Sequence, residues 1–247
     1  LLNPDDGIVN AYVINELIDN PIVELITKNG MVKRTNLNDF IVSRYSKTYT
    51  AIKLKLDDLL INVLISKEKT LLITKTGYYL NYHTEEIPIS GPKAAGVKGI
   101  NLKDDQVVAG LNYNNLDEYV NIFTNKLTGK RTKLNDLKLL TRAKRGNTII
   151  KKIKSTNYEI INSFITNSKD IIGLKFDEDI KYIKNSEISI MDLISTGSTI
   201  SKKKIDKYFI KKDLYILKEE INNEKESFIE EEIKEFTLED FIEDFKL

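Results

Sequence analysis

Short runs of apolar residues, each followed by a polar turn, recur four times along the chain. They read VELITKNGMVKRT from Val23, TLLITKTGYYLNY from Thr70, YVNIFTNKLTGKRT from Tyr119 and DIIGLKFDEDIKYI from Asp170, about 47–51 residues apart. The runs are short and rich in Ile, Val, Leu and Tyr, which favours β-strands over helices. Each repeat therefore begins with a predicted antiparallel strand pair.

The turns of these pairs contain residues suited to a positive φ. Gly30, Gly77 and Gly129 lie at or just after the turn of the first three pairs, and residues 177–179 take that place in the fourth. Glycine has no Cβ and adopts a positive φ without a clash. The turn chemistry supports the predicted hairpins.

A second half follows each strand pair, at residues 50–65, 98–111 and 148–165. Two short apolar runs flank a polar turn there, and Ile52, Leu54 and Leu56 alternate with period 2, which predicts further strands. A unit of four antiparallel strands cannot bury both faces alone, so successive sheets must pack on one another. The predicted fold is all-β, a propeller-like ring of four-stranded blades.

One octapeptide occurs twice in nearly identical form. KRTNLNDF occupies residues 33–40 and KRTKLNDL occupies residues 130–137, with six of the eight positions identical. Chance explains such identity poorly, so the two copies are expected to lie in equivalent structural environments.

The repeat divides the chain into six predicted segments. The turn NPDDG followed by IVNAYVI makes the N-terminal segment look like the closing half of an earlier blade, and Phe228, Ile229, Ile233 and Phe236 follow helical spacing in the C-terminal one. The segments are the closing half of an earlier, truncated blade at 1–21, blades at 22–66, 67–115 and 116–167, a blade plus the start of a closing strand at 168–217, and a partly helical or disordered acidic tail at 218–247.

Charge is distributed unevenly although the formal net charge is only +1. Residues 218–247 contain twelve Asp/Glu and four Lys, a balance of −8, which leaves +9 on residues 1–217. A basic body with an acidic tail is typical of a polyanion-binding module that carries its own competitor, although a solvated acidic end has the same composition.

Features that the sequence lacks also limit the class of protein. There is no cysteine, which excludes disulfides and thiolate metal sites and fits a reducing cytoplasm. No apolar run approaches the roughly 20 residues of a membrane span, and the first residues do not resemble a secretory signal. We therefore expect a cytoplasmic protein without a membrane partner.

Candidate catalytic groups are scarce. His83 is the only histidine, and GPKAAGVKG (91–99) matches no phosphate-binding glycine motif. The carboxylate pairs at 57–58 and 104–105 recur at the same place in successive repeats, which fits turns better than acid–base chemistry. The sequence does not indicate an enzyme or a metal site.

Cations recur at the middle of each repeat, between the first strand pair and the second. Equivalent loops of packed blades lie on the same side, so these cations predict a band suited to the curved phosphate backbone of a nucleic acid rather than to a small ligand, without reading bases. Any single one of them is also compatible with ordinary solvated surface. The residues are Arg44 and Lys47, Lys93 and Lys98, then Arg142, Lys144 and Arg145, and in the fourth repeat the lysines of SKKKIDKYFIKK (201–212).

Three stretches carry a resemblance to a known family. ITKNGMVKRT, ISGPKAAGVKGINLKDDQVV and AKRGNTIIKKIK resemble the C-terminal domain of the A-type subunit of bacterial topoisomerase IV, of the Gram-positive type, over roughly residues 8–165. The resemblance implies a β-pinwheel, in which neighbouring blades exchange strands and a basic rim binds and bends DNA. It would place the seven Arg and Lys residues named above on that rim. The octapeptide cations Lys33, Arg34, Lys130 and Arg131 are added to the expected DNA contacts.

The resemblance also implies partners and a role. The full enzyme uses ATP and Mg²⁺ and contains a second polypeptide, the B-type subunit of topoisomerase IV. Its catalytic tyrosine lies in the N-terminal part of the A-type polypeptide, so this domain would need no cofactor and would guide the transported segment in decatenation and relaxation. The twelve tyrosines of this chain are expected to be strand and surface residues.

Two alternatives remain at this stage. The A-type subunit of gyrase, the related wrapping enzyme, carries a box Q-R-R-G-G-K-G, whereas the nearest stretch here is RAKRGNT (142–148), with one glycine instead of two. A propeller that binds proteins rather than DNA is the alternative from another class.

Overall fold

The computed structural model describes residues 7–12, 20–41, 49–177 and 179–211. All of them belong to one compact unit, residues 1–212. The predicted acidic tail at 218–247, and Arg44 and Lys47, lie outside the described residues.

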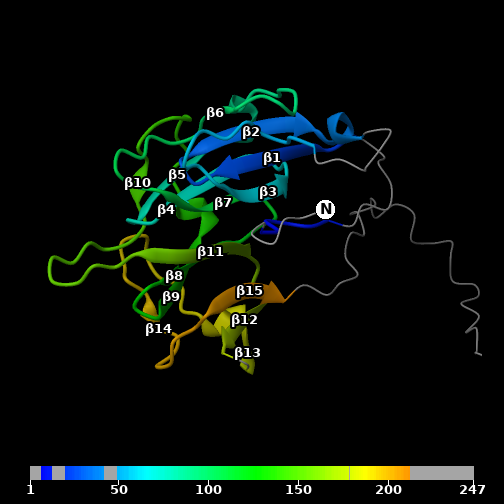
Figure 1. The fold of residues 1–247 in the computed structure, drawn as a ribbon. Coiled ribbons are helices and arrows are strands. Elements are labelled where there is room, and N and C mark those ends of the chain that lie inside the picture. Colours follow the sequence, from blue (N-terminus) through cyan, green and yellow to red (C-terminus); the bar gives the residue numbers. More distant parts are fainter. Residues whose placement is uncertain (1–6, 13–19, 42–48, 178, 212–247) are drawn as a thin grey trace, which may run out of the picture. The chain divides into compact units, whose positions relative to one another are not determined.

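The regular secondary structure of the described residues consists almost entirely of β-strands, joined by long connections (Figure 1). The strands are β1 (Ile22–Thr27), β2 (Met31–Asn36), β3 (Leu60–Ile65), β4 (Lys69–Thr74), β5 (Tyr78–His83), β6 (Val97–Lys98), β7 (Val107–Tyr113), β8 (Tyr119–Thr124), β9 (Thr128–Lys133), β10 (Asn147–Thr148), β11 (Ile160–Thr166), β12 (Ile171–Phe176), β13 (Asp179–Lys184), β14 (Ser198–Thr199) and β15 (Lys207–Lys211). Short 3-10 turns follow the second strand of each repeat: η1 (Leu37–Phe40), η2 (Thr84–Glu86), η3 (Leu134–Asp136) and η4 (Asn185–Glu187).

Four antiparallel sheets result, one for each repeat. Their strand orders are β3-β1-β2-β6, β10-β5-β4-β7, β11-β8-β9-β14 and β13-β12-β15. The all-β prediction is confirmed. We call the repeats 1 to 4; their first three long strands are β1–β3, then β4, β5 and β7, then β8, β9 and β11, and finally β12, β13 and β15.

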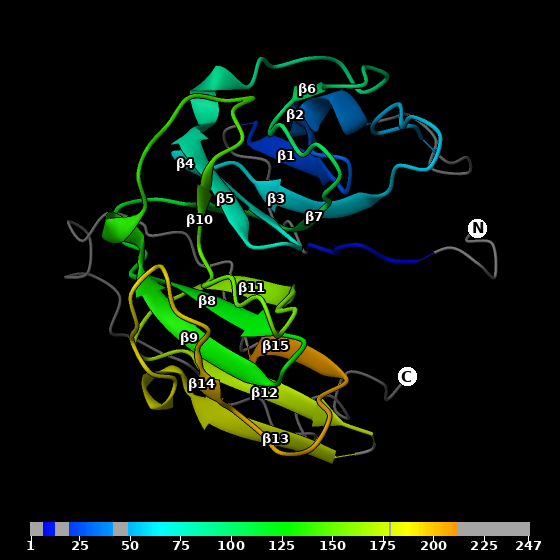
Figure 2. The same ribbon diagram turned by 90° about the vertical axis from the view of Figure 1, so that its left-hand side faces the viewer.

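Neighbouring repeats exchange a strand. The two-residue strands β6, β10 and β14 belong in sequence to repeats 2, 3 and 4, yet each completes the sheet of the preceding repeat, as Figure 2 shows for β10 beside β5. A glycine with φ near +80° precedes each of them: Gly96, Gly146 and Gly197. A repeat thus supplies three long strands to its own sheet and one short strand to its neighbour's, instead of four strands to its own.

The predicted alternation at Ile52, Leu54 and Leu56 does not form a strand. Ile52 is buried, but Leu54 is 40% exposed and Leu56 is 91% exposed. The part of the repeat before its third strand is occupied by the crossing to the neighbouring sheet, so period 2 in a short run is a misleading signal here.

Turn chemistry follows the prediction in three repeats out of four. Gly30 and Gly77 have φ of +76° and +89°, and Asp177 has φ of +46° in the fourth turn. In repeat 3 the positive φ falls on Leu127 instead. Gly129 lies in β9, where a Cβ would approach Ile200 to 2.8 Å, so it serves packing rather than the turn.

The core lies between sheets rather than within them. Ile26 and Val32 of repeat 1 pack with Leu72 and Leu80 of repeat 2. Further clusters join repeat 2 to repeat 3 and repeat 3 to repeat 4 in the same way. Interior sheets therefore bury both faces, as stacked repeats require.

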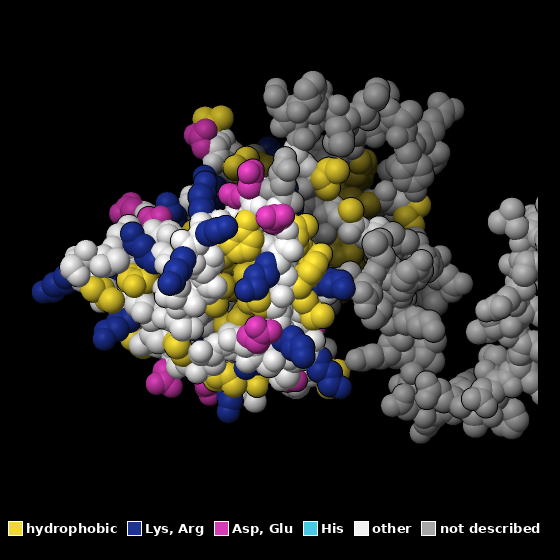
Figure 3. Space-filling model, turned by 90° about the horizontal axis from the view of Figure 1, so that it is seen from below, with side chains coloured by type: hydrophobic (Ala, Val, Ile, Leu, Met, Phe, Trp, Pro, Cys, Tyr) yellow, Lys and Arg dark blue, Asp and Glu magenta, His cyan; other side chains and the backbone are white. Residues whose placement is uncertain are grey.

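Repeat 4 lacks this cover in the described part of the chain. No fourth strand is seen on β13, and Ile180 and Tyr182 are 48% and 50% exposed. The residues that correspond to Ile180 in repeats 1 and 2, Val32 and Tyr79, are buried. Figure 3 shows Lys and Arg side chains among exposed hydrophobic ones on the lower face of the molecule.

An asparagine contact links third strands of neighbouring repeats. Asn62 donates to Gly110 O at 2.8 Å, and Asn162 donates to Tyr208 O at 3.4 Å. Asn10 donates to Val63 O at 3.0 Å in the corresponding way. Residues near Asn10 thus lie against β3, and the assignment of 1–21 to the closing half of an earlier blade stays a prediction.

Candidate nucleic-acid interface

The segments that lead from the second to the third long strand of each repeat lie next to one another in the part of the chain that the structure describes, which leaves out 42–48. We call residues 41–59, 87–106, 137–159 and 188–206 the crossing segments. Backbone hydrogen bonds join each to the next: Lys53 N to Ala94 O (3.2 Å), Ala143 N to Gly99 O (2.8 Å) and Lys151 N to Ser195 O (3.4 Å). Equivalent loops of successive repeats therefore lie side by side.

Exposed lysines are distributed along all four crossing segments. Within the described ranges, the ion pairs that involve these segments are Lys75–Glu159 and Lys204–Asp206. Most of the lysines consequently have no carboxylate partner there and can bind an external anion. The exposed lysines are Lys53, Lys55, Lys93, Lys98, Lys103, Lys138, Lys144, Lys151, Lys152, Lys154, Lys202, Lys203 and Lys204.

Carboxylates of the crossing segments have structural tasks. Asp58 accepts from Asn29 N at 2.8 Å, and Asp105 accepts from Thr76 N at 3.2 Å. Each of these donors belongs to the turn of a first hairpin. The interpretation of the Asp pairs as turn residues is confirmed for Asp58 and Asp105, which hold a hairpin turn against the crossing segment.

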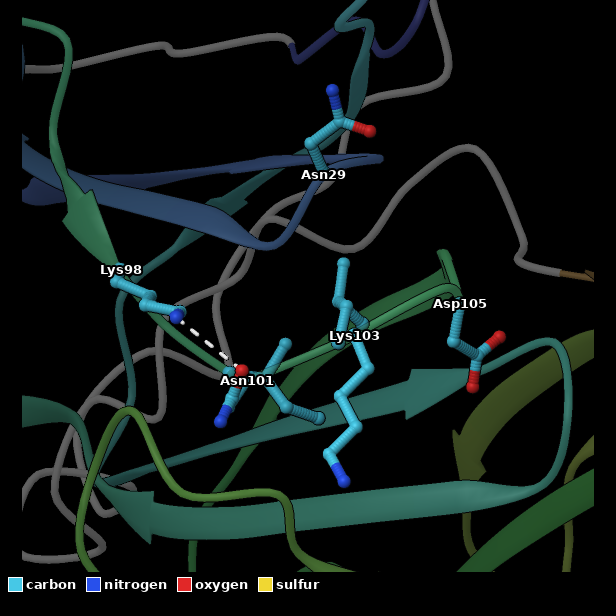
Figure 4. A pocket seen from close by; sticks show the side chains of 7 residues that line it. Asn29, Lys98, Asn101, Lys103 and Asp105 are labelled. Carbon is cyan, nitrogen blue, oxygen red and sulfur yellow. Dashed lines mark hydrogen bonds between the residues drawn. The ribbon is translucent and has the colours of Figure 1, made fainter.

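Three lysines predicted as contacts, Lys93, Lys98 and Lys144, are exposed on the crossing segments. Lys98 also lines a hollow of about 330 Å³ together with Asn101 and Lys103. Its ammonium donates to Asn101 Oδ1 at 3.3 Å (Figure 4). The hollow is open rather than enclosed, and its lining also includes Asp105 and the apolar residues Ile100 and Leu102.

The two predicted arginines on the crossing segment of repeat 3, Arg142 and Arg145, are tied to the protein itself. Arg142 donates to Lys98 O at 2.6 Å and to Glu86 O at 3.0 Å. Arg145 donates to Leu102 O, and its guanidinium lies 4.2 Å from the centre of the Tyr78 ring. Both side chains fasten the crossing segment of repeat 3 onto that of repeat 2, and they are only partly exposed.

Lys152 is a site residue that the sequence does not single out. It lies 4.4 Å from the centre of the Tyr78 ring and donates to Tyr78 Oη at 3.1 Å, which lowers the pKa of that phenol. The run TIIKKIK reads as a strand in the sequence, and the structure places its two consecutive lysines, Lys151 and Lys152, on the crossing surface instead.

Lys33 and Lys130, predicted as DNA contacts, are buried, with exposures of 0% and 1%, so this prediction is wrong. Lys33 Nζ donates to Ala51 O at 2.6 Å and to Pro92 O at 2.5 Å. Lys130 Nζ donates to three carbonyl oxygens, at 2.6–2.9 Å. Burial lowers the pKa of Lys130 to about 8. Buried and bonded to carbonyl groups inside the protein, these ammonium groups do not contact a phosphate.

Arg34 and Arg131, also predicted as contacts, bind backbone carbonyls as well. Arg34 donates to Thr84 O and Ile87 O at 3.1 and 3.2 Å. Arg131, which is 7% exposed, donates to Ile188 O at 2.7 Å. Each guanidinium reaches the 3-10 turn of the following repeat. The two octapeptides thus occupy equivalent environments, as expected, but their cations are structural.

Other candidate chemistry is sparse in the described residues. His83 is exposed at the end of β5. No group of three His, Cys, Asp or Glu side chains in the described ranges could hold a metal ion. None of the helices in this part of the chain has the length and apolar character that crossing a membrane requires.

Comparison with known proteins agrees with this arrangement. The family model described as DNA gyrase C-terminal domain, beta-propeller, matches residues 25–67, 68–113 and 118–167. The A-type subunit of DNA topoisomerase 4 from Bacillus subtilis (strain 168) is 34% identical over 201 residues, covering 80% of this chain and 25% of the relative. The corresponding protein of Staphylococcus epidermidis is 30% identical over 203 residues, covering 81% and 25%. The chain thus spans about a quarter of the length of these curated relatives.

Two solved structures share the fold. A crystal structure of the C-terminal domain of DNA topoisomerase IV superposes with a TM-score of 0.79 at 33% identity, covering 85% of this chain and 67% of that one. A structure of a DNA gyrase A C-terminal domain gives 0.68 at 20% identity, covering 79% and 67%, which supports the fold alone. Together with the exchanged strands and the matched repeats, these likenesses show that the chain is a β-pinwheel belonging to the family of C-terminal domains of gyrase A and its topoisomerase IV counterpart.

Proposed function

We propose that this chain binds duplex DNA through phosphate contacts along its crossing segments. The observation that carries the proposal is the continuous succession of these segments, each bonded to the next and each exposing lysines. A row of cations without local carboxylate partners attracts a polyanion and releases its counterions. The contacts of this surface are those of Lys93, Lys98, Lys144 and the other exposed lysines, and Arg142 and Arg145 hold the segments in place.

The proposed role is to bend the duplex and guide the transported segment during decatenation and relaxation. Phosphate contacts position DNA without reading its bases, so bending is the natural outcome of a row of such contacts. Membership of the family and the names of the relatives, which are DNA topoisomerase 4 polypeptides of the A type, support this assignment. The domain is not catalytic by itself.

The remaining machinery is proposed to lie outside this chain. An N-terminal catalytic part of the same polypeptide would supply the tyrosine, and the B-type subunit of topoisomerase IV would complete an ATP-dependent, Mg²⁺-using type IIA enzyme in the cytoplasm. No cofactor is assigned to this domain.

Gyrase-type wrapping is the second candidate, because a gyrase A C-terminal domain shares the fold. Topoisomerase IV is favoured because RAKRGNT (142–148) has one glycine where the gyrase box has two. Its arginines Arg142 and Arg145 are also engaged with backbone carbonyls of repeat 2. Topology assays on a minicircle distinguish the two, because wrapping traps a supercoil of constant sign and a simple bend does not.

A salt titration with duplexes of unrelated sequence tests the proposed function. The logarithm of the affinity should fall linearly with log[salt], by about 0.9 for each phosphate contact, and equally for every sequence. The double variant Lys93→Gln, Lys144→Gln should lower that slope, whereas Lys67→Gln, on the connection from β3 to β4, should not. Absent or salt-insensitive duplex binding would favour a protein-interaction platform.

A further inference from the structure

Lys33 and Lys130 occupy the same place in their repeats, and each bridges two successive crossing segments. Lys33 joins Ala51, in the first segment, to Pro92, in the second. Lys130 joins Ile149, in the third, to Asp192 and Leu193, in the fourth. The bonded carbonyls at 51, 92 and 149 lie within two residues of exposed lysines at 53, 93 and 151.

The chemistry of an ammonium group suits this task. It offers three protons that can point at separate acceptors, and Lys130 satisfies all three with backbone carbonyls. Those acceptors are neutral, and the carboxylates of Asp39 and Asp192 act on the two ammonium groups through space rather than by a hydrogen bond or ion pair. A buried lysine bonded only to carbonyls costs desolvation, which a purely apolar residue at this position would avoid.

The other two repeats show what happens without such a bridge. In repeat 2 the position is Leu80, and there the junction of crossing segments is made instead by Arg142 and Arg145, which donate to carbonyls of the preceding segment. In repeat 4 the position is Lys181, which is exposed, and no further crossing segment follows in the described ranges. The equivalence rests on register, since Lys33, Leu80, Lys130 and Lys181 pair with the fourth residue of the first strand.

We infer that Lys33 and Lys130 are positioning residues of the DNA interface, which set the spacing between the lysines of two successive crossing segments without touching phosphate. The inference rests on the proposed DNA-binding function. It explains why one octapeptide is present twice although its cations are hidden. At each of these two junctions, a buried lysine sets the positions of the exposed lysines of the surface.

The test uses Lys130→Met in the full chain, with Lys181→Met as a matched control. Both remove one positive charge from the same repeat position, but only Lys130 bridges two segments. For Lys130→Met, amide hydrogen exchange should accelerate in residues 149–153 and 192–196. The slope of log affinity against log[salt] should become shallower by more than the amount that one phosphate contact contributes. Duplex affinity should be about tenfold weaker near 0.1 M salt. Lys181→Met should change neither quantity.

Lys130→Arg separates position from charge and serves if the methionine variant does not fold. It keeps the charge, but a planar guanidinium cannot direct its protons at the same three carbonyls, so a lower slope and faster exchange are again expected. The inference is overturned if a folded Lys130 variant has the same amide hydrogen exchange and the same salt slope of duplex binding as Lys181→Met. Failure of the wild-type chain to bind duplex DNA would instead contradict the proposed function, and the exchange comparison would still decide the bridging role.

Discussion

At the scale of single residues, burial decides what a charged side chain does in this protein. Glu24 in β1 is fully buried at the junction of repeats 1 and 2. Its carboxyl group accepts hydrogen bonds from Thr70 Oγ1 at 3.0 Å and from Asn112 Nδ2 at 3.4 Å. Burial raises the pKa of Glu24 to about 7, against the smaller opposing effects of these bonds and of Arg34.

This shift makes stability depend on pH near neutrality. Between the usual carboxyl pKa of 4.5 and about 7, the unfolded chain loses the Glu24 proton while the folded chain keeps it. The free energy of unfolding should therefore fall as pH rises through that window, by roughly 3 kcal/mol in total, and then level off. Urea titrations between pH 4.5 and 8 measure this loss.

Glu24→Gln supplies the comparison. A neutral amide fits the site, because Asn121 occupies the equivalent position in repeat 3 and is also buried. The variant should lack the decline with pH, so the difference between the two proteins should grow towards pH 8. Parallel pH profiles for both proteins would contradict the raised pKa.

A second residue-scale prediction separates binding from support on one crossing segment. Lys144 is exposed, whereas Arg145 donates to Leu102 O and lies over Tyr78. Lys144→Glu should weaken duplex binding about tenfold near 0.1 M salt without lowering the melting temperature. Arg145→Glu should lower both the duplex affinity and the melting temperature. Equal melting temperatures for the two variants would count against a supporting role of Arg145.

At the scale of elements, the hairpins could be predicted from sequence and the crossings between sheets could not. The first strand pairs follow from apolar runs with Gly30 and Gly77 at their turns, because that information is local. The two-residue strands β6, β10 and β14 have no periodicity of their own. They form because another repeat offers a free edge.

The same limit applies to the candidate site. The sequence identifies a charged residue, but it does not show which backbone carbonyl groups the fold brings next to that residue. Lys33 and Lys144 therefore look alike in sequence, and only the fold shows that one is buried and the other exposed. Repetition of whole octapeptides, rather than of isolated cations, is the signal in the sequence that points to a structural role.

Glycine at the crossing gives an element-scale prediction. Gly146 has φ of +82°, and a Cβ there would lie 2.0 Å from Tyr79 O, beside β10. Gly146→Ala should destabilise the fold by about 2 kcal/mol or more, because both the backbone strain and the clash oppose docking. Gly91→Ala, also on a crossing segment, is the control, since its Cβ would meet no atom within 4 Å. Equal urea midpoints for the two variants would show that the close approach is not needed.

At the scale of the whole molecule, charge is segregated along the chain. Residues 1–217 have a net charge of +9, and residues 218–247 have −8. Long-range attraction of DNA depends on the summed field as well as on individual contacts, and salt screens it over about 10 Å at 0.1 M. The acidic residues should therefore reduce the affinity of the basic crossing surface for phosphate.

Removing residues 218–247 is expected to tighten duplex binding, and the gain should be larger at about 50 mM salt than at about 200 mM because screening weakens the competition. Binding isotherms at the two salt concentrations measure it. A full-length variant with the twelve acidic residues changed to Gln and Asn is the control, since it removes the charge and keeps the length. If truncation tightens binding but neutralisation does not, the tail acts by occupying space. If neither changes the affinity, the segregated charge has no part in DNA binding, and the lysines of the crossing segments act alone.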